Sequence, residues 1–155
     1  MITRNNLVFL ELDRPTPSGR TYPKYEIRKA LVEYQNKIVQ GRTIGCFVDD
    51  INIATSTFDL KNASHKIISA DIIGDNLVGT IQTLSTPKGQ FLETLVDNPE
   101  LHFDTRGMGQ VDIFKVVTDF SIMGIDVYML PGRIRPTLPS NPISDYDRAM
   151  GIVKR

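Results

Sequence analysis

One amphipathic helix among several short apolar runs limits how this chain can fold. Between residues 24 and 40, apolar side chains recur at spacings of four, three and four residues. They are Ile27, Leu31, Tyr34 and Ile38. This spacing lies on one face of a helix, with Pro23 at its start and Gly41 at its end. One such helix has to bury its apolar face against other elements, and the rest of the chain favours strands for that role.

The strands are predicted from apolar runs bounded by turn residues. The runs cover residues 7–12, 43–48, 66–73, 77–84, 101–105, 111–120 and 121–129, and the polar stretch 51–64 is predicted as a loop. Gly74-Asp75-Asn76 predicts a hairpin, and residues 106–109 predict a second turn. A short helix is predicted near residues 90–96, with Phe91, Leu92 and Leu95 inward. The result is an α+β fold, mostly antiparallel sheet with two packed helices.

After Pro131 the chain changes character. Residues 131–155 hold four of the nine prolines and five of the 18 Lys and Arg, but only two acids, so their net charge is 5 − 2 = +3. Such a proline density prevents a strand or a long helix. We therefore predict a domain over residues 1–131 and an extended arm over 132–155. The arm is either a disordered terminus or a segment that orders against an acidic groove of a partner. Its candidate partner-binding residues are Ile134, Leu138, Ile143 and Tyr146, with Ile152 beyond them.

Composition narrows the classes of function. The formal net charge is zero, so no global field attracts nucleic acid or an anionic membrane. The lone Cys46 excludes an intrachain disulfide and the four-ligand zinc patterns, and its apolar neighbours predict a buried thiol. No apolar run approaches the ~20 residues of a membrane span, and the first residues do not resemble a signal peptide. We expect a cytoplasmic origin, with no cofactor and no metal.

Six short segments carry a resemblance through their order. They are Gly19-Arg20-Thr21-Tyr22-Pro23, Asn62-Ala63-Ser64-His65-Lys66-Ile67, Gly74-Asp75-Asn76-Leu77-Val78-Gly79, Leu84-Ser85-Thr86-Pro87-Lys88-Gly89, Thr105-Arg106-Gly107-Met108-Gly109 and Ile125-Asp126-Val127. In this order the chain resembles the prohead core protease family of tailed phages, maturation proteases that share a fold with the herpesvirus capsid protease, assemblin. The resemblance covers about residues 16–131. It implies a barrel-like sheet.

The same resemblance puts acids at the catalytic positions. The family's catalytic histidine corresponds to Asp49, and its nucleophilic serine corresponds to Asp104, with Thr105 beside it. Serine attack needs a base that takes and returns a proton near neutral pH, and an aspartate with a pKa near 4 does this poorly. The expectation is a degenerate protease, with no catalytic residues.

Several alternatives stay open at this stage. Thr105 would be the nucleophile if the register slips by one residue, but Asp49 would still be its base. In a separate alternative, His102 would replace the lost base. Asp49 and Asp104 would share a proton as in aspartic proteases, or bind a divalent cation. His65 is either a remnant of the site or a hydrogen-bonded structural residue. Arg106 is expected to pair locally, beside glycines that give a turn its backbone freedom.

The resemblance implies a non-enzymatic structural protein of a tailed-phage virion. It would act as a capsid decoration or minor head protein, binding the major capsid protein or copies of itself, and would assemble in the host cytoplasm. The first alternative is a prohead maturation endopeptidase of the serine type. The second is an unrelated small binding module, which would lack a barrel-like sheet.

Overall fold

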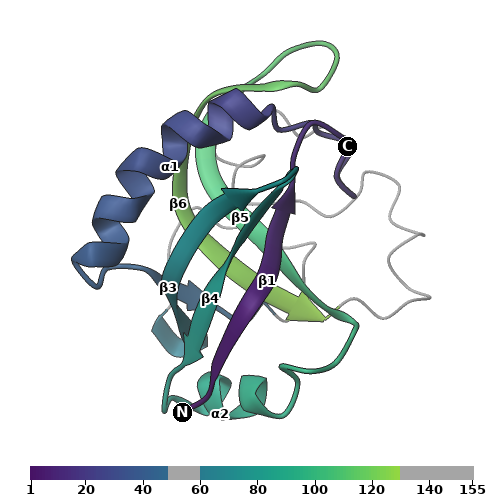
Figure 1. The fold of residues 1–155 in the computed structure, drawn as a ribbon. Coiled ribbons are helices and arrows are strands. Elements are labelled where there is room, and N and C mark those ends of the chain that lie inside the picture. The colour runs from purple at the N-terminus through teal and green to yellow at the C-terminus, as the bar shows by residue number, and fades with distance from the viewer. Residues whose placement is uncertain (49–59, 130–155) are drawn as a thin grey trace.

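The domain consists of two antiparallel sheets and two α-helices (Figure 1). The structure, a computed structural model, describes residues 1–48 and 60–129. The elements in chain order are β1 (Thr3–Glu11), α1 (Lys24–Val39), β2 (Ile44–Cys46), a 3₁₀ turn η1 (Leu60–Asn62), β3 (Ala63–Ile73), β4 (Asn76–Thr83), α2 (Pro87–Glu93), β5 (Leu101–Val111) and β6 (Val117–Met129). The α+β class predicted from the sequence is confirmed. The arm and most of the predicted 51–64 loop lie outside the described residues, and Ala63 and Ser64 begin β3.

The larger sheet has the strand order β1-β4-β3-β2. Its centre is the predicted β3–β4 hairpin, in which Gly74 adopts a φ of 63° that glycine reaches without a Cβ penalty. β1 then pairs antiparallel with β4 and not with its sequence neighbour. The hairpin turn also holds the end of β1, because the Leu12 amide donates to the Asp75 carbonyl over 2.8 Å.

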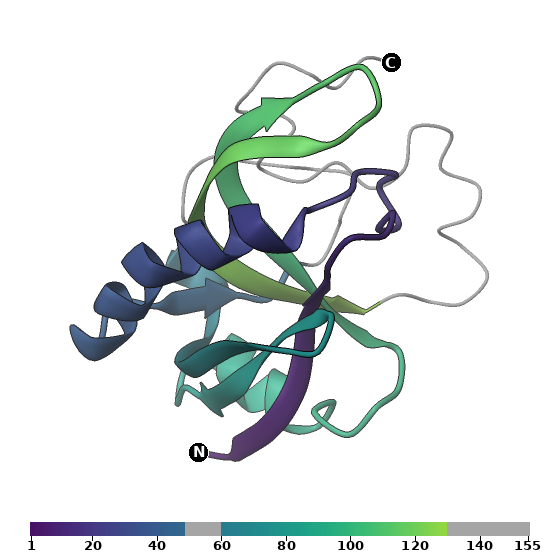
Figure 2. The same ribbon diagram turned by 45° about the horizontal axis from the view of Figure 1, so that its top comes forward.

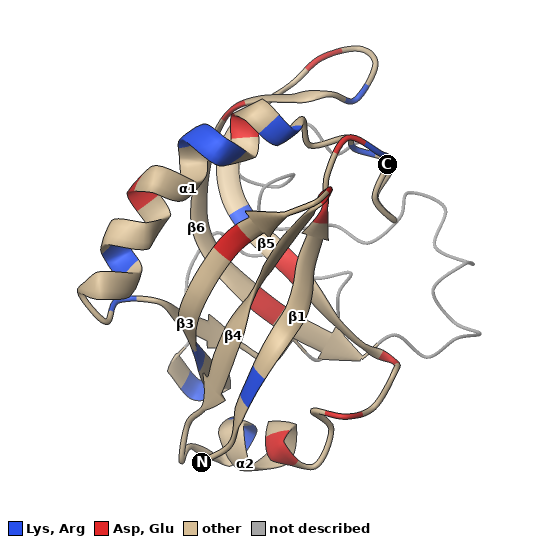
Figure 3. Ribbon diagram, in the orientation of Figure 1, with Lys and Arg blue, Asp and Glu red and all other residues tan. Residues whose placement is uncertain are grey.

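Helix α1 lies where the periodicity predicts it. Ile27, Leu31 and Tyr34 are fully or almost fully buried, and the helix packs on β6 and β3. Both ends of its first turn are tied to other elements: the Lys24 amide donates to Asp13, and the Glu26 carboxylate accepts from the Asp119 amide of β6. Charges of both signs lie along α1, whereas the strands of the larger sheet are mostly uncharged (Figure 3).

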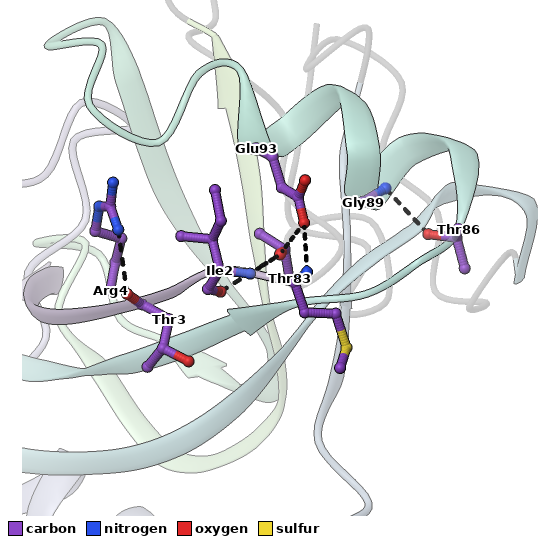
Figure 4. Close-up of polar contacts among 8 residues, drawn as sticks. Ile2, Thr3, Arg4, Thr83, Thr86, Gly89 and Glu93 are labelled. Atoms are coloured by element: carbon purple, nitrogen blue, oxygen red, sulfur yellow. Dashed lines mark hydrogen bonds and ion pairs between the residues drawn. The ribbon is translucent and has the colours of Figure 1, made fainter.

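Helix α2 closes one end of the larger sheet. Thr86 caps it by accepting from the Gly89 amide, and Glu93 at its other end accepts a 2.8 Å hydrogen bond from the Thr83 hydroxyl of β4 (Figure 4). The same hydroxyl oxygen accepts from the Ile2 amide, so α2, β4 and the start of β1 meet at one point. Leu92 is buried as predicted, but Phe91 is half exposed, and its ring packs edge-on against Phe47.

The second sheet corrects the sequence prediction. The turn expected at residues 106–109 is wrong: β5 runs through it, and the real turn lies at residues 112–116. There the Asp112 carboxylate accepts from the amides of Phe114 and Val116, which builds the turn without glycine or proline. Gly107 lies at an irregularity in the ladder and is needed for space, because a Cβ there would lie 2.2 Å from the Ser121 carbonyl oxygen.

Within residues 1–48 and 60–129, backbone hydrogen bonds between strands join the two sheets on one side, between the end of β2 and β6. β2 is prolonged toward β6 by a parallel bridge from Phe47 to Val127, and the Val48 amide donates to the Val127 carbonyl. The strands thus follow the order β1-β4-β3-β2-β6-β5, and within the described ranges β5 forms no ladder with β1. The resemblance implied a barrel-like sheet, and no closed barrel is found. The β5–β6 hairpin instead projects beyond the larger sheet, past the start of α1 (Figure 2).

Candidate functional site

The face of β5 that bears Asp104 is set by strand alternation. His102, Asp104 and Arg106 point to one face, opposite Tyr128, Asp126 and Gly124 of β6 in register. The ladder is regular from residue 101 to 106, so Thr105 points to the other face. Thr105 is only 2% exposed, and its hydroxyl has no hydrogen-bond partner among the described residues. Thr105 and His102 therefore do not face each other as a nucleophile and its base.

A buried ion pair occupies the centre of this face. Arg106 donates from Nε and Nη2 to the two carboxylate oxygens of Asp126, over 2.9 and 3.2 Å. The Asp126 carboxylate also accepts from the Cys46 amide at 3.0 Å, so it joins β2, β5 and β6. The guanidinium lies over Gly124, where a Cβ would approach Nη2 to 2.2 Å. Arg106 pairs as expected, but its partner Asp126 was not predicted, because the hairpin turn was expected at residues 106–109 and lies at residues 112–116.

His65 of β3 is enclosed and fixed. Its Nε2 lies 2.8 Å from the carbonyl oxygen of Ile125, which can only accept, so Nε2 carries the proton. Nδ1 then accepts from the Ser64 hydroxyl at 2.7 Å. Burial lowers the pKa of His65 below its ordinary value, outweighing the backbone hydrogen bond that raises it. Ser64 and His65 are fully buried, so this pair of a hydroxyl and an imidazole is closed to a substrate.

Asp104 borders a groove of about 460 Å³ between β1 and β5. We define the β1–β5 groove by its lining, which comprises residues 7–11 of β1, residues 16–18, Arg20 and Tyr22 of the following loop, residues 101–105 of β5, and Tyr128. The ring of His102 stacks on Tyr128 at its edge, with centroids 5.8 Å apart. Partial burial lowers the pKa of His102 and the Glu100 charge raises it, with burial dominant. The groove thus brings His102 and Asp104 together with Arg20 of the Gly19-Arg20 segment.

Other residues predicted for the site lie outside the described ranges. Asp49 follows directly on Val48, the last residue described before the gap, and Val48 lies beside β6. The approach of Asp49 to Asp104 is therefore a prediction still, as are the arm residues Ile134, Leu138, Ile143 and Tyr146.

Acidic residues in the described ranges do not gather into a metal site. No group of three or more His, Cys, Asp or Glu side chains lies close enough there to hold an ion. Asp126 faces Asp104 across the ladder, but its carboxylate already binds Arg106 and the Cys46 amide. Cys46 itself is buried, as predicted. No helix in the described ranges has the length and apolarity of a membrane span.

The fold is similar to that of a solved structure, the bacteriophage T4 capsid assembly protease gp21. The TM-score is 0.68 at 17% sequence identity, over 84% of this chain and 92% of that one. At this identity the likeness concerns the fold, and it confirms the capsid-assembly-protease-like fold implied by the motif order. The sequence matches no protein-family model and no curated protein.

Replacing Asp126 by Asn is expected to destabilise the protein strongly. The substitution leaves the buried Arg106 charge without its carboxylate, which costs about 3–5 kcal/mol of unfolding free energy. Chemical denaturation followed by circular dichroism measures the loss. Asp119→Asn on the same strand is the control, because Asp119 is exposed and asparagine tolerates its φ of 53°. Equal stability of the two variants would contradict a structural role for the ion pair.

The stability of the protein is expected to fall as the pH drops below about 6.5, the pKa of an unfolded histidine. Below that pH the unfolded chain binds a proton at His65, whereas the folded protein, with its lowered pKa, does not. The unfolding free energy then declines by up to about 1.4 kcal/mol per pH unit, until the folded-state pKa is reached. Denaturation at about pH 7 and about pH 5 measures this slope. A His65→Gln variant should lose the part of this pH dependence that His65 contributes. The same slope in the variant and the wild type would contradict the role of His65.

Proposed function

We propose that this chain is a head-assembly protein of a tailed phage that keeps the fold of a capsid assembly protease and does not cleave peptides. Two findings support it together: the fold likeness to the T4 capsid assembly protease and the order of the six motif segments. The resemblance assigns Asp49 and Asp104 to the catalytic histidine and serine positions. The work of the protein is then to bind other head components.

The observation that carries the proposal is the side-chain inventory around the β1–β5 groove. A serine-type mechanism needs a hydroxyl or thiol next to an accessible imidazole. In the described ranges Ser64 and His65 are adjacent but fully buried, Thr105 and His102 point to opposite faces, and Cys46 is buried. Thr16 and Ser18 also line the groove, but their hydroxyls are hydrogen-bonded to each other and to the backbone carbonyl and Nε of Arg20. The groove presents Asp104 at the strand position that the resemblance gives to the nucleophile.

A carboxylate at that position does not replace a serine. Acyl transfer requires a nucleophile that loses a proton to a base and a base that returns it to the leaving amine. In subtilisin, removal of the nucleophile or the base alone costs about a million-fold in kcat. With aspartate at both positions, as the resemblance assigns them, we expect no measurable cleavage.

The partner and the location follow from the same proposal. The partner is the major capsid protein, with contacts between copies of this chain as a second mode, and the location is the virion head. The arm contributes Ile134, Leu138, Ile143 and Tyr146 as apolar anchors, and its +3 charge suits an acidic surface. The competing function is the maturation endopeptidase of the serine type. It is favoured by the fold likeness to a protease and by His102 next to Asp104 in the groove.

We expect purified protein to leave the scaffold and capsid proteins of its phage intact, and the full-length chain to be abundant in mature heads. Gel analysis of an overnight incubation and mass spectrometry of purified virions check the two outcomes. An Arg20→Lys variant changes the lining of the groove and keeps Asp49 and Asp104. It should also be inactive. Cleavage that disappears on changing Asp49, Asp104 or His102 would establish the endopeptidase instead.

Deletion of residues 132–155 is expected to abolish incorporation into heads, because it removes the anchors while leaving all described elements in place. The amount of protein per virion, compared with the major capsid protein, gives the readout. Thermal unfolding of the truncated chain controls for loss of the fold. A truncated chain that folds and reaches wild-type occupancy would remove the arm from the proposal.

A further inference from the structure

The lining of the β1–β5 groove shows that it touches the edges of two strands. Side chains alternate between the faces of a strand, so a groove on one face is lined by every second residue. Here five consecutive residues of β1, 7–11, and five consecutive residues of β5, 101–105, line it. The groove therefore reaches the backbone of both strands.

Both of these edges lack a ladder partner in the described ranges. β1 is the outer strand of the larger sheet, and β5 pairs only with β6. The two strands meet where the Phe9 and Phe103 rings pack with centroids 5.0 Å apart, and β1 crosses β5 in that region (Figure 2). Unpaired strand edges with apolar side chains beside them accept an added extended segment.

The described chain ends at the rim of this groove. Met129 is the last residue of β6 and pairs with Leu101 of β5. Leu101 lines the groove, and so does Tyr128, the residue before Met129. Another 26 residues follow, 155 − 129, which is far more than the few needed to cross one strand at about 4.8 Å per strand spacing. A segment tethered this closely has an effective concentration in the millimolar range.

The charge and the sequence pattern of the arm also favour it as the segment that fills the groove. Residues 130–143 contain Arg133 and Arg135 and no acid, and Ile134 lies between the two arginines. In an extended segment Ile134 points opposite to both arginines. The groove has apolar walls at Leu7, Phe9 and Phe103, and the carboxylate-bearing residues Glu11 and Asp104 belong to its lining.

We propose that the arm of this chain docks in its own β1–β5 groove as a short extended segment, residues 132–135 between Pro131 and Pro136, with Ile134 in the groove. The docked arm occupies the cleft of the protease-like body and is withheld from other partners. One part of this inference rests on the proposed function: the capsid protein would compete with the groove for the arm during head assembly. The docking itself is a property of the isolated protein and is tested without phage.

Photocrosslinking of the full-length chain tests the docking. Benzoylphenylalanine replaces Val8, which lines the groove and is 45% exposed, and in a matched control it replaces Ile68, a 40% exposed residue of β3 outside the groove. After irradiation, mass spectrometry should find crosslinks from position 8 to residues 130–143 of the same chain, and none of these from position 68. An equal mixture of ¹⁴N- and ¹⁵N-labelled protein separates intrachain from interchain products.

An added Ile134→Asp substitution should lower the yield of the arm crosslink about tenfold, the effect of losing one buried apolar side chain, and Ile134→Val should retain it. Crosslinks of mixed isotope would place the arm in a second copy and overturn docking in the same chain. Absence of arm crosslinks from position 8, with normal thermal unfolding, would overturn the proposal outright. Neither result bears on proteolysis or head incorporation, which have their own assays.

Discussion

The carboxylate of Asp126 is the group on which the assembly of the domain depends. It accepts from Arg106 on β5 and from the Cys46 amide at the end of β2, and it projects from β6. The Phe47–Val127 bridge follows immediately, so the link between the two sheets lies where this carboxylate is held. A buried carboxylate is tolerated only with such partners. Gly124 leaves the space that lets the guanidinium reach it.

Local signals in the sequence predict local structure well in this protein. The periodicity of α1 and the Gly74 hairpin depend on residues close in the chain, and both agree with the structure. The β5–β6 hairpin was misplaced because the glycines at 107 and 109 look like a turn, whereas Gly107 makes room for Ser121 and Phe120. The true turn depends on the side chain of Asp112, a weaker signal.

In the candidate site, too, some features were predicted from the sequence and others were not. The motif order led to the fold and singled out His65, Asp104 and Arg106 from the sequence alone. It did not predict that His65 would be enclosed between Ser64 and the Ile125 carbonyl, because that contact joins β3 to β6 across 60 residues. Nor did it predict the β1–β5 groove, whose walls come from strands about 90 residues apart. The chemistry of a site built on sheet edges depends on long-range pairing.

The pairing of β1 with β4 has a consequence for synthesis. Thr3 pairs with Gln82, a separation of 82 − 3 = 79 residues, and β1 has no other ladder partner in the described ranges. During translation β1 therefore leaves the ribosome long before the strand it pairs with, while α1 can form at once from local contacts. During this interval Phe9 and Leu12, which are almost fully buried in the folded protein, lie in a segment that has no partner strand yet. The polar run Thr3-Arg4-Asn5-Asn6 ahead of them makes this segment less prone to premature aggregation.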